Sequence, residues 1–229
     1  MTAPETAATA EGRADGLHPP VKRPRLRTAG SLVDQRLGGG DGLQARILRD
    51  ESGARGSLAA LRRAASKAPG EVPETWSLTE VPANDQTGPL GDSPTWNEIA
   101  VHTAMTLYAV HQQSRTTGMF RPGVGLGGAA RKLIGPADQE NPSARARFNA
   151  LVTSTTLAEL QHHLRTFVSL LRSQDIGLDH AMLADDIVDF QRPGCAKRVR
   201  LRWARQYSFT RQNEDDAQDA ADASSQTLN

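Results

Sequence analysis

The sequence has a single cysteine, Cys195, and few aromatic residues, which make up 4% of its 229 residues. One thiol excludes an internal disulfide and a zinc site built from several cysteines. No apolar run reaches the length of about 18 residues that a membrane-spanning helix needs. The beginning of the chain also lacks the basic segment and apolar segment of a secretory signal. These absences favour a cytoplasmic protein in a reducing compartment, with no membrane partner.

The net charge of +1 conceals an uneven distribution. Residues 213–229 carry five acids and no base, whereas residues 1–30 carry five bases and three acids, so residues 31–212 have a net charge of +4. Between Arg192 and Arg211 the chain has seven basic residues and no acid. Clusters of this kind attract polyanions, so nucleic acid is the class of partner that the charge favours.

Apolar residues at helical spacing run through the middle of the chain, and no stretch shows the period-two alternation of a strand. We therefore expect an all-α fold. A connection rich in glycine and proline, residues 114–123, predicts a division into two small helical-bundle lobes, residues 31–120 and 121–211. The arm formed by residues 1–30 and the acidic tail formed by residues 212–229 lack periodicity, and we expect both to be disordered.

Capping residues indicate where several helices begin. Ser93 followed by Pro94 predicts the start of a central, largely apolar and therefore buried helix. Thr156 and Glu159 have the spacing of a capping box. Asp179 is expected to cap the helix that follows.

Glycine and proline indicate where other helices end or break. Gly53–Gly56 is expected to separate two helical segments. A short helix is expected over residues 126–134, because Gly135–Pro136 would end it. Ser143 is expected to cap the next helix, and the last helix should cover residues 196–209.

The last helix carries the strongest functional pattern. At about 100° per residue, Arg198, Arg202 and Arg205 share one narrow stripe, and the apolar residues form a separate stripe. No acid lies on this helix to pair with the arginines. A guanidinium group suits phosphate because it can donate two parallel hydrogen bonds. The stripe therefore predicts contact with nucleic acid.

Further basic clusters extend this candidate surface. Few aromatic residues interleave with these bases, so stacking on nucleobases is not expected. Contact with the nucleic-acid backbone, without reading of sequence, is the expected mode. The residues are Arg62 and Arg63 in one cluster, and Arg131, Lys132, Arg145 and Arg147 in another.

The sequence shows no catalytic set, and no metal or cofactor site is predicted. Asp185, Asp186 and Asp189 leave open a magnesium-dependent nuclease, although an acidic solvent-facing surface is the better interpretation. A second alternative is a sequence-specific DNA-binding regulator whose two helices meet at Pro193–Gly194. Against it, the arginines lie along the last helix rather than mainly at its start.

Four segments occur in an order that resembles one known family. They read GSLAALRRAASKAPGEVPETW (Gly56–Trp76), LYAVHQQS (Leu107–Ser114), GLGGAARKL (Gly125–Leu133) and RWARQYS in the last helix. Over residues 54–209 the chain is similar to CasB-type proteins, especially those of actinobacteria. These proteins are the small subunits of the type I-E CRISPR interference complex, Cascade.

The resemblance implies a non-catalytic, all-α subunit that assembles with the other Cascade protein subunits and the guide crRNA, in two copies packed head to tail. It also implies a basic surface that holds the displaced, single-stranded non-target DNA. Gly128 stands where an arginine is frequent, and the two terminal segments lie outside the family's common core. The basic residues that match are Arg62, Arg63, Arg145, Arg147, Arg165, Arg198 and Arg202.

Overall fold

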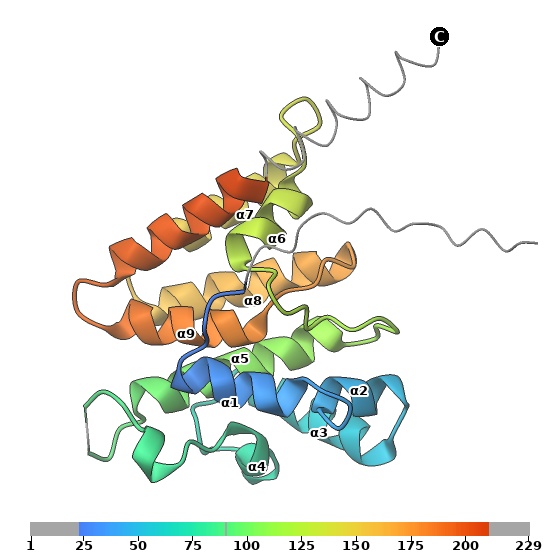
Figure 1. Cartoon of the computed structure of the whole chain (residues 1–229), viewed down its shortest axis with the longest axis vertical. Coiled ribbons are helices and arrows are strands. Elements are labelled where there is room, and N and C mark those ends of the chain that lie inside the picture. Colours follow the sequence, from blue (N-terminus) through green and yellow to red (C-terminus); the bar gives the residue numbers. More distant parts are fainter. Residues whose placement is uncertain (1–22, 90, 211–229) are drawn as a thin grey trace, which may run out of the picture.

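The structure is a computed structural model that describes residues 23–89 and 91–210, in which helices are joined by loops (Figure 1). In these residues no strand occurs, and an isolated bridge pairs Phe120 with Leu178. The prediction of an all-α fold is confirmed. The helices are α1 (Thr28–Leu37), α2 (Leu43–Leu48), α3 (Ser52–Ala64), α4 (Trp76–Thr79), α5 (Trp96–Gln112), α6 (Leu126–Ile134), α7 (Pro142–Thr153), α8 (Leu157–Ser173) and α9 (His180–Gln191), with short 3-10 helices η1 (Pro73–Thr75) and η2 (Ala83–Asp85) and a last described helix over residues 196–210.

Helices α5 and α9 form the centre of the fold. Thirteen of the seventeen residues of α5 are buried, as its apolar circumference predicts, and so are eleven of the twelve residues of α9. Helix α5 packs against α1, α3, α8 and α9. None of the described helices is both long enough and apolar enough to cross a membrane.

The other helices lie on opposite sides of this centre. In Figure 1, α2, α3 and α4 lie below α5, whereas α6, α7 and the 196–210 helix lie above α8 and α9. Helix α9, from the expected C-terminal lobe, packs directly on α1 and α5 from the expected N-terminal lobe. Helices from the two expected lobes are thus in contact with each other. The boundary between residues 120 and 121 stays a prediction.

Helix caps explain most of the boundaries. Thr156 and Asp179 cap α8 and α9 as predicted, each accepting backbone N–H donors. The predicted capping box of α8 is incomplete, because Glu159 accepts the backbone N–H of Thr155 instead of that of Thr156. Helix α5 begins two residues later than expected, because Thr95 and Glu98 form a complete capping box there. Helix α7 is capped by Asn141, with a proline at its first position, instead of Ser143.

The structure corrects two other predictions, one about a helix break and one about a disordered segment. The Gly53–Gly56 segment does not interrupt the chain but lies within α3. Residues 23–30 are ordered, because α1 begins at Thr28 and Arg23 binds the carboxylate of Asp179 at 2.6 Å. The expected disorder of residues 1–22 and of the acidic tail, residues 212–229, lies outside the described residues.

Candidate nucleic-acid interface

The helix over residues 196–210 lies against the body of the protein through its apolar side. Val199 and Trp203 are fully buried, and Nε1 of Trp203 donates to a carboxylate oxygen of Asp186 on α9 at 2.6 Å. The helix also passes very close to α6. A Cβ atom added at Gly127 would lie 1.9 Å from the carbonyl oxygen of Trp203. These contacts fix which side of the helix faces solvent.

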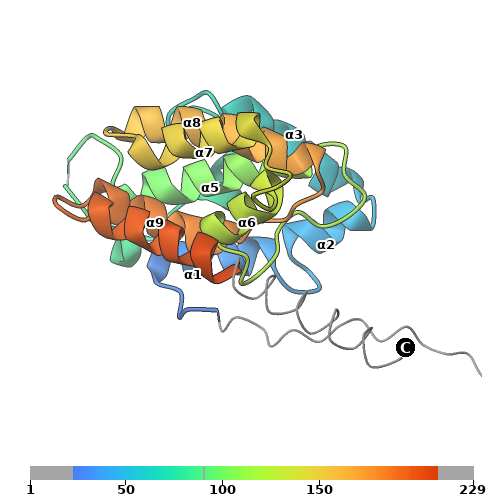
Figure 2. The ribbon, with the colours of Figure 1, turned by 90° about the horizontal axis from the view of Figure 1, so that it is seen from above.

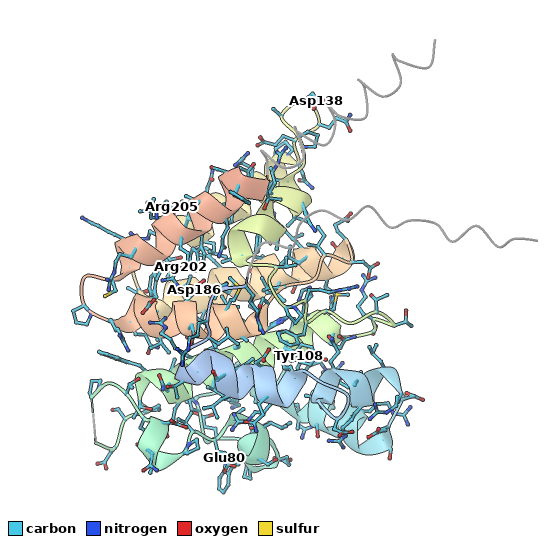
Figure 3. The ribbon with its side chains drawn as sticks, viewed as in Figure 1. Glu80, Tyr108, Asp138, Asp186, Arg202 and Arg205 are labelled. Carbon is cyan, nitrogen blue, oxygen red and sulfur yellow. The ribbon has the colours of Figure 1, made fainter. Side chains whose placement is uncertain are left out.

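The three arginines of the predicted stripe differ in their exposure to solvent. Arg198 and Arg205 are exposed, whereas Arg202 is half-buried and turns toward α9 (Figure 3). Its guanidinium donates to Asp186 and, at 2.8 Å, to Asp189. The prediction that the stripe lacks acidic partners is therefore wrong for Arg202. Its partners lie 16 and 13 residues earlier in the chain, on a different helix.

The three aspartates of α9 form the opposite half of this contact. Asp185, Asp186 and Asp189 are 6%, 2% and 7% exposed, so the prediction of an acidic solvent-facing surface is wrong. Asp185 accepts the backbone N–H groups of Arg27 and Gly30, at 2.7 and 2.8 Å. Burial raises the pKa of Asp186 to about 6. Residues 23–89 and 91–210 contain no group of three or more His, Cys, Asp or Glu placed to hold a metal ion.

The basic cluster of α6 and α7 is partly built into the structure. Arg131 is buried and donates to the carbonyl oxygen of Gly135 at 2.5 Å. Arg145 is half-buried between Glu140, at 2.8 Å, and the hydroxyl of Tyr207, at 2.7 Å. The hydrogen bond to Glu140 raises the pKa of Arg145, so this charge is held firmly in place. The other two bases of the cluster, Lys132 and Arg147, are exposed.

The basic residues of α3 and α8 come together on one side of the molecule. Arg62 and Arg63 are exposed near the end of α3, and Arg63 forms an ion pair with Glu74 at 3.2 Å. From α8, Arg165 donates to the carbonyl oxygen of Ala65, which ties its guanidinium to the end of α3. The sequence placed these bases in separate helices, and the fold makes them neighbours.

Seven of the ten predicted residues are exposed: Arg62, Arg63, Lys132, Arg147, Arg165, Arg198 and Arg205. Whether they bind nucleic acid stays a prediction. The sequence analysis missed the structural role of Arg23 and Arg27. Arg27 donates to Asp189 at 2.6 Å, so it belongs to the same cluster as Arg202. Both arginines lie in the arm that was expected to be disordered, and no pattern in the sequence indicated these partners.

Comparison with known proteins gives consistent results. A model of the family "CRISPR-associated protein Cse2" matches residues 57–207. The crystal structure of CasB from Thermobifida fusca is 35% identical in sequence, covers 80% of this chain and 99% of its own, and has a TM-score of 0.66. No curated protein matches the chain.

More distant structures share the fold. A Cse2-family CRISPR-associated protein from Thermus thermophilus is 24% identical, covers 80% of this chain and 99% of its own, and has a TM-score of 0.56. CasB from M. ruber is 23% identical, covers 77% of this chain and 98% of its own, and has a TM-score of 0.53. Because the family match spans most of the described chain and a 35% identical structure aligns over nearly its whole length, the chain belongs to the Cse2 family of CRISPR-associated proteins.

Proposed function

We propose that this CRISPR-associated protein is the non-catalytic small subunit of the type I-E interference complex, Cascade. In this role it binds the backbone of guide RNA and DNA, and holds the displaced non-target strand in the cytoplasm. The observation that carries the proposal is the pair of exposed arginines, Arg198 and Arg205, on a helix without acids. Trp203 and Arg202 anchor this helix to the body of the protein. The helix therefore presents Arg198 and Arg205 to solvent from a fixed position.

Backbone contact explains how such a surface would act on DNA. Opening a duplex to pair one strand with guide RNA exchanges one helix for another of similar stability. A protein that binds the displaced strand shifts this balance toward the open form without reading any base. Binding of this kind releases counterions from the phosphates, so it weakens steeply as salt rises.

The acidic cluster supports a role without catalysis. A nuclease needs carboxylates that are free to bind metal ions and water. Asp186 and Asp189 instead accept hydrogen bonds from Arg202, and Asp185 accepts two backbone N–H groups. We infer that these groups hold the 196–210 helix, α9 and α1 together.

The distribution of charge supports assembly with a second copy. Residues 69–98 contain six acids and no base, and residues 192–210 contain six bases and no acid. Figure 3 places Glu80, from the first segment, at the bottom of the molecule and Arg205, from the second, in its upper part, below Asp138. Separate surfaces of opposite charge suit two copies packed head to tail, because electrostatic attraction guides their association.

The alternative is a helical regulator that reads duplex DNA. A helix-turn-helix protein places its first helix across the DNA backbone and its second in the major groove. Helix α9 would be that first helix, and burial of eleven of its twelve residues leaves little of it to meet DNA. The packing of α9 and the 196–210 helix therefore favours a structural role for this pair over a DNA-binding helix-turn-helix.

Binding of labelled single strands and duplexes of unrelated sequence, measured by fluorescence anisotropy across a salt series, separates the two functions. The proposal predicts similar affinities for all single strands and a fall in log affinity of about 0.7 per phosphate contact for each log unit of salt. Tight binding of one duplex sequence, with weak binding of the others, would establish the regulator instead.

A further inference from the structure

A small polar cavity lies where α3, α5 and α8 meet. Figure 2 shows α3 and α8 along the same side of the molecule, with α5 beneath them. The cavity has a volume of about 130 Å³, and no acid lines it. An enclosed cavity of about 150 Å³ accommodates one benzene molecule, so this space matches a small ring such as a ribose. Its lining consists of Ala65, Ser66, Lys67, His102, Thr103, Thr106, Leu107, Gln161 and Arg165.

Two positively charged side chains, Lys67 and Arg165, line this cavity. Arg165 uses one N–H of its guanidinium to bind the carbonyl oxygen of Ala65, so its position is fixed while its other donors stay available. The ammonium of Lys67 lies 4.0 Å from Glu71, and both side chains are more than half exposed. Such a pair contributes little, so the ammonium can exchange this partner for a phosphate.

His102 contributes a buried, neutral ring to the wall of the cavity. The side chain is 5% exposed, and Nε2 lies 3.2 and 3.1 Å from the carbonyl oxygens of Ala64 and Lys67. Carbonyl oxygens only accept, so Nε2 must carry the proton. Burial lowers the pKa of His102, which keeps the ring neutral and leaves a lone pair on Nδ1. Nδ1 is buried and has no hydrogen-bond partner within the described residues, so a ligand in the cavity does not reach it.

Gln161 and Thr103 complete the polar wall. Nε2 of Gln161 donates to the hydroxyl oxygen of Thr103 at 2.8 Å. This bond directs the amide nitrogen to Thr103 and leaves the amide oxygen of Gln161 as an acceptor. The cavity thus combines two cations with a neutral acceptor, and a ligand that satisfies both must carry an anion and a hydroxyl group that donates.

We infer that this cavity binds one ribose-phosphate unit of RNA, with the phosphate on Lys67 and Arg165 and the 2′-hydroxyl donating to the amide oxygen of Gln161. The 2′-hydroxyl distinguishes RNA from DNA, and deoxyribose would leave this acceptor without a donor. The inference rests on the proposed function and assigns the α3–α8 surface to RNA. The strand-holding role then belongs to the exposed arginines of the 196–210 helix.

The test compares three labelled oligonucleotides of one sequence, as RNA, DNA and 2′-O-methyl RNA, by fluorescence anisotropy with the full chain at low salt. RNA should bind about three- to tenfold more tightly than DNA, the range that one additional hydrogen bond supplies. The 2′-O-methyl form keeps the oxygen but cannot donate, so it should bind like DNA. Equal affinity for RNA and DNA, or no measurable RNA binding, would overturn the inference.

Variants separate the phosphate contacts from the hydroxyl contact. Lys67→Ala with Arg165→Ala should weaken binding of RNA about tenfold or more. Gln161→Leu, at a half-buried position, should reduce the preference for RNA while leaving DNA affinity unchanged. Arg49→Ala is the control, because this exposed arginine is paired with Glu51 on another part of the surface. If the first variant binds RNA like the unaltered chain, the inference is wrong.

The same experiment distinguishes this inference from the proposed function. Binding of single-stranded DNA that persists without any preference for RNA would overturn the RNA cavity and leave strand holding intact. A preference for RNA that depends on Gln161, together with no binding of single-stranded DNA, would support the cavity and contradict strand holding.

Discussion

Replacing Gly127 with alanine should separate the 196–210 helix from α6. The new Cβ would lie 1.9 Å from the carbonyl oxygen of Trp203 and 2.8 Å from the backbone nitrogen of Tyr207. Since real Cβ contacts essentially never fall below 3.0 Å, the two helices must move apart by more than 1 Å. Both obstructing atoms belong to the backbone, so no side chain can rotate away to relieve the contact.

The expected cost follows from two opposing effects. Crowding in a packed interior costs about 1–3 kcal/mol and sometimes more, whereas exchanging glycine for alanine inside a helix gains about 1 kcal/mol. A clash between backbones belongs at the upper end, so Gly127→Ala should lower the free energy of unfolding by about 2 kcal/mol. That loss is large beside a total stability of about 5–15 kcal/mol.

The assay is urea unfolding followed by far-ultraviolet circular dichroism, with Gly56→Ala as the matched control. Gly56 is an exposed position inside α3 where an added Cβ meets nothing within 4 Å, so this change should stabilise the protein by about 0.4–1 kcal/mol. Gly127→Ala should also weaken single-strand binding, because Arg198 and Arg205 move with their helix. Equal and small effects at both glycines would refute the close packing of these helices.

Three further predictions concern stability. Trp203→Phe removes the donor to buried Asp186 and should cost about 1.5–3 kcal/mol in urea unfolding, and a loss below about 0.5 kcal/mol would contradict that hydrogen bond. Thr95→Ala should cost about 0.5–2 kcal/mol through loss of the α5 cap, and an unchanged urea midpoint would argue against it. Burial lowers the pKa of His111, which lies beside His180, to about 4. The unfolded chain therefore binds the extra proton first, and stability should fall by about 3 kcal/mol as pH drops from about 6.5 to 4. His111→Gln should reduce this fall in unfolding measured at pH 7 and 4.5, and an undiminished fall would exclude His111 as a cause.

Local signals predicted much of the fold correctly. The expected helix over residues 126–134 has the bounds of α6, because Gly135–Pro136 ends it as predicted. Thr156 and Asp179 cap the helices that they were expected to cap. These features depend on atoms within a few residues of each other. Ser93 failed as a cap because Thr95, two residues later, has a glutamate at the position that completes the capping box.

Contacts between distant segments were beyond the reach of sequence patterns. The stripe of Arg198, Arg202 and Arg205 was sought on one helix, and acids were sought on that same helix. Arg202 is paired with α9 instead, which only the packing of the two helices brings about. Arg27 joins the same cluster from more than 150 residues away, at Asp185 and Asp189.

The contacts of each arginine also determine whether its replacement would change stability, nucleic-acid binding or both. Arg202 has a structural partner in Asp186, so replacing it would change stability together with binding. Arg198 and Arg205 are exposed and lie on the same helix, so their replacement tests the surface alone. The exposed pair is therefore the suitable choice for functional work.

The most direct test of strand holding is the lifetime of the opened DNA in the assembled complex, measured for Arg198→Ala with Arg205→Ala. The control replaces Arg49 and Arg55, two exposed arginines held by Glu51 and Asp50. Strand holding predicts that the first variant shortens the lifetime about thirtyfold, since two charge-assisted contacts of about 1 kcal/mol each are lost, and that the control leaves it unchanged. An equal lifetime in both variants, with both proteins folded and assembled, would contradict the proposed function.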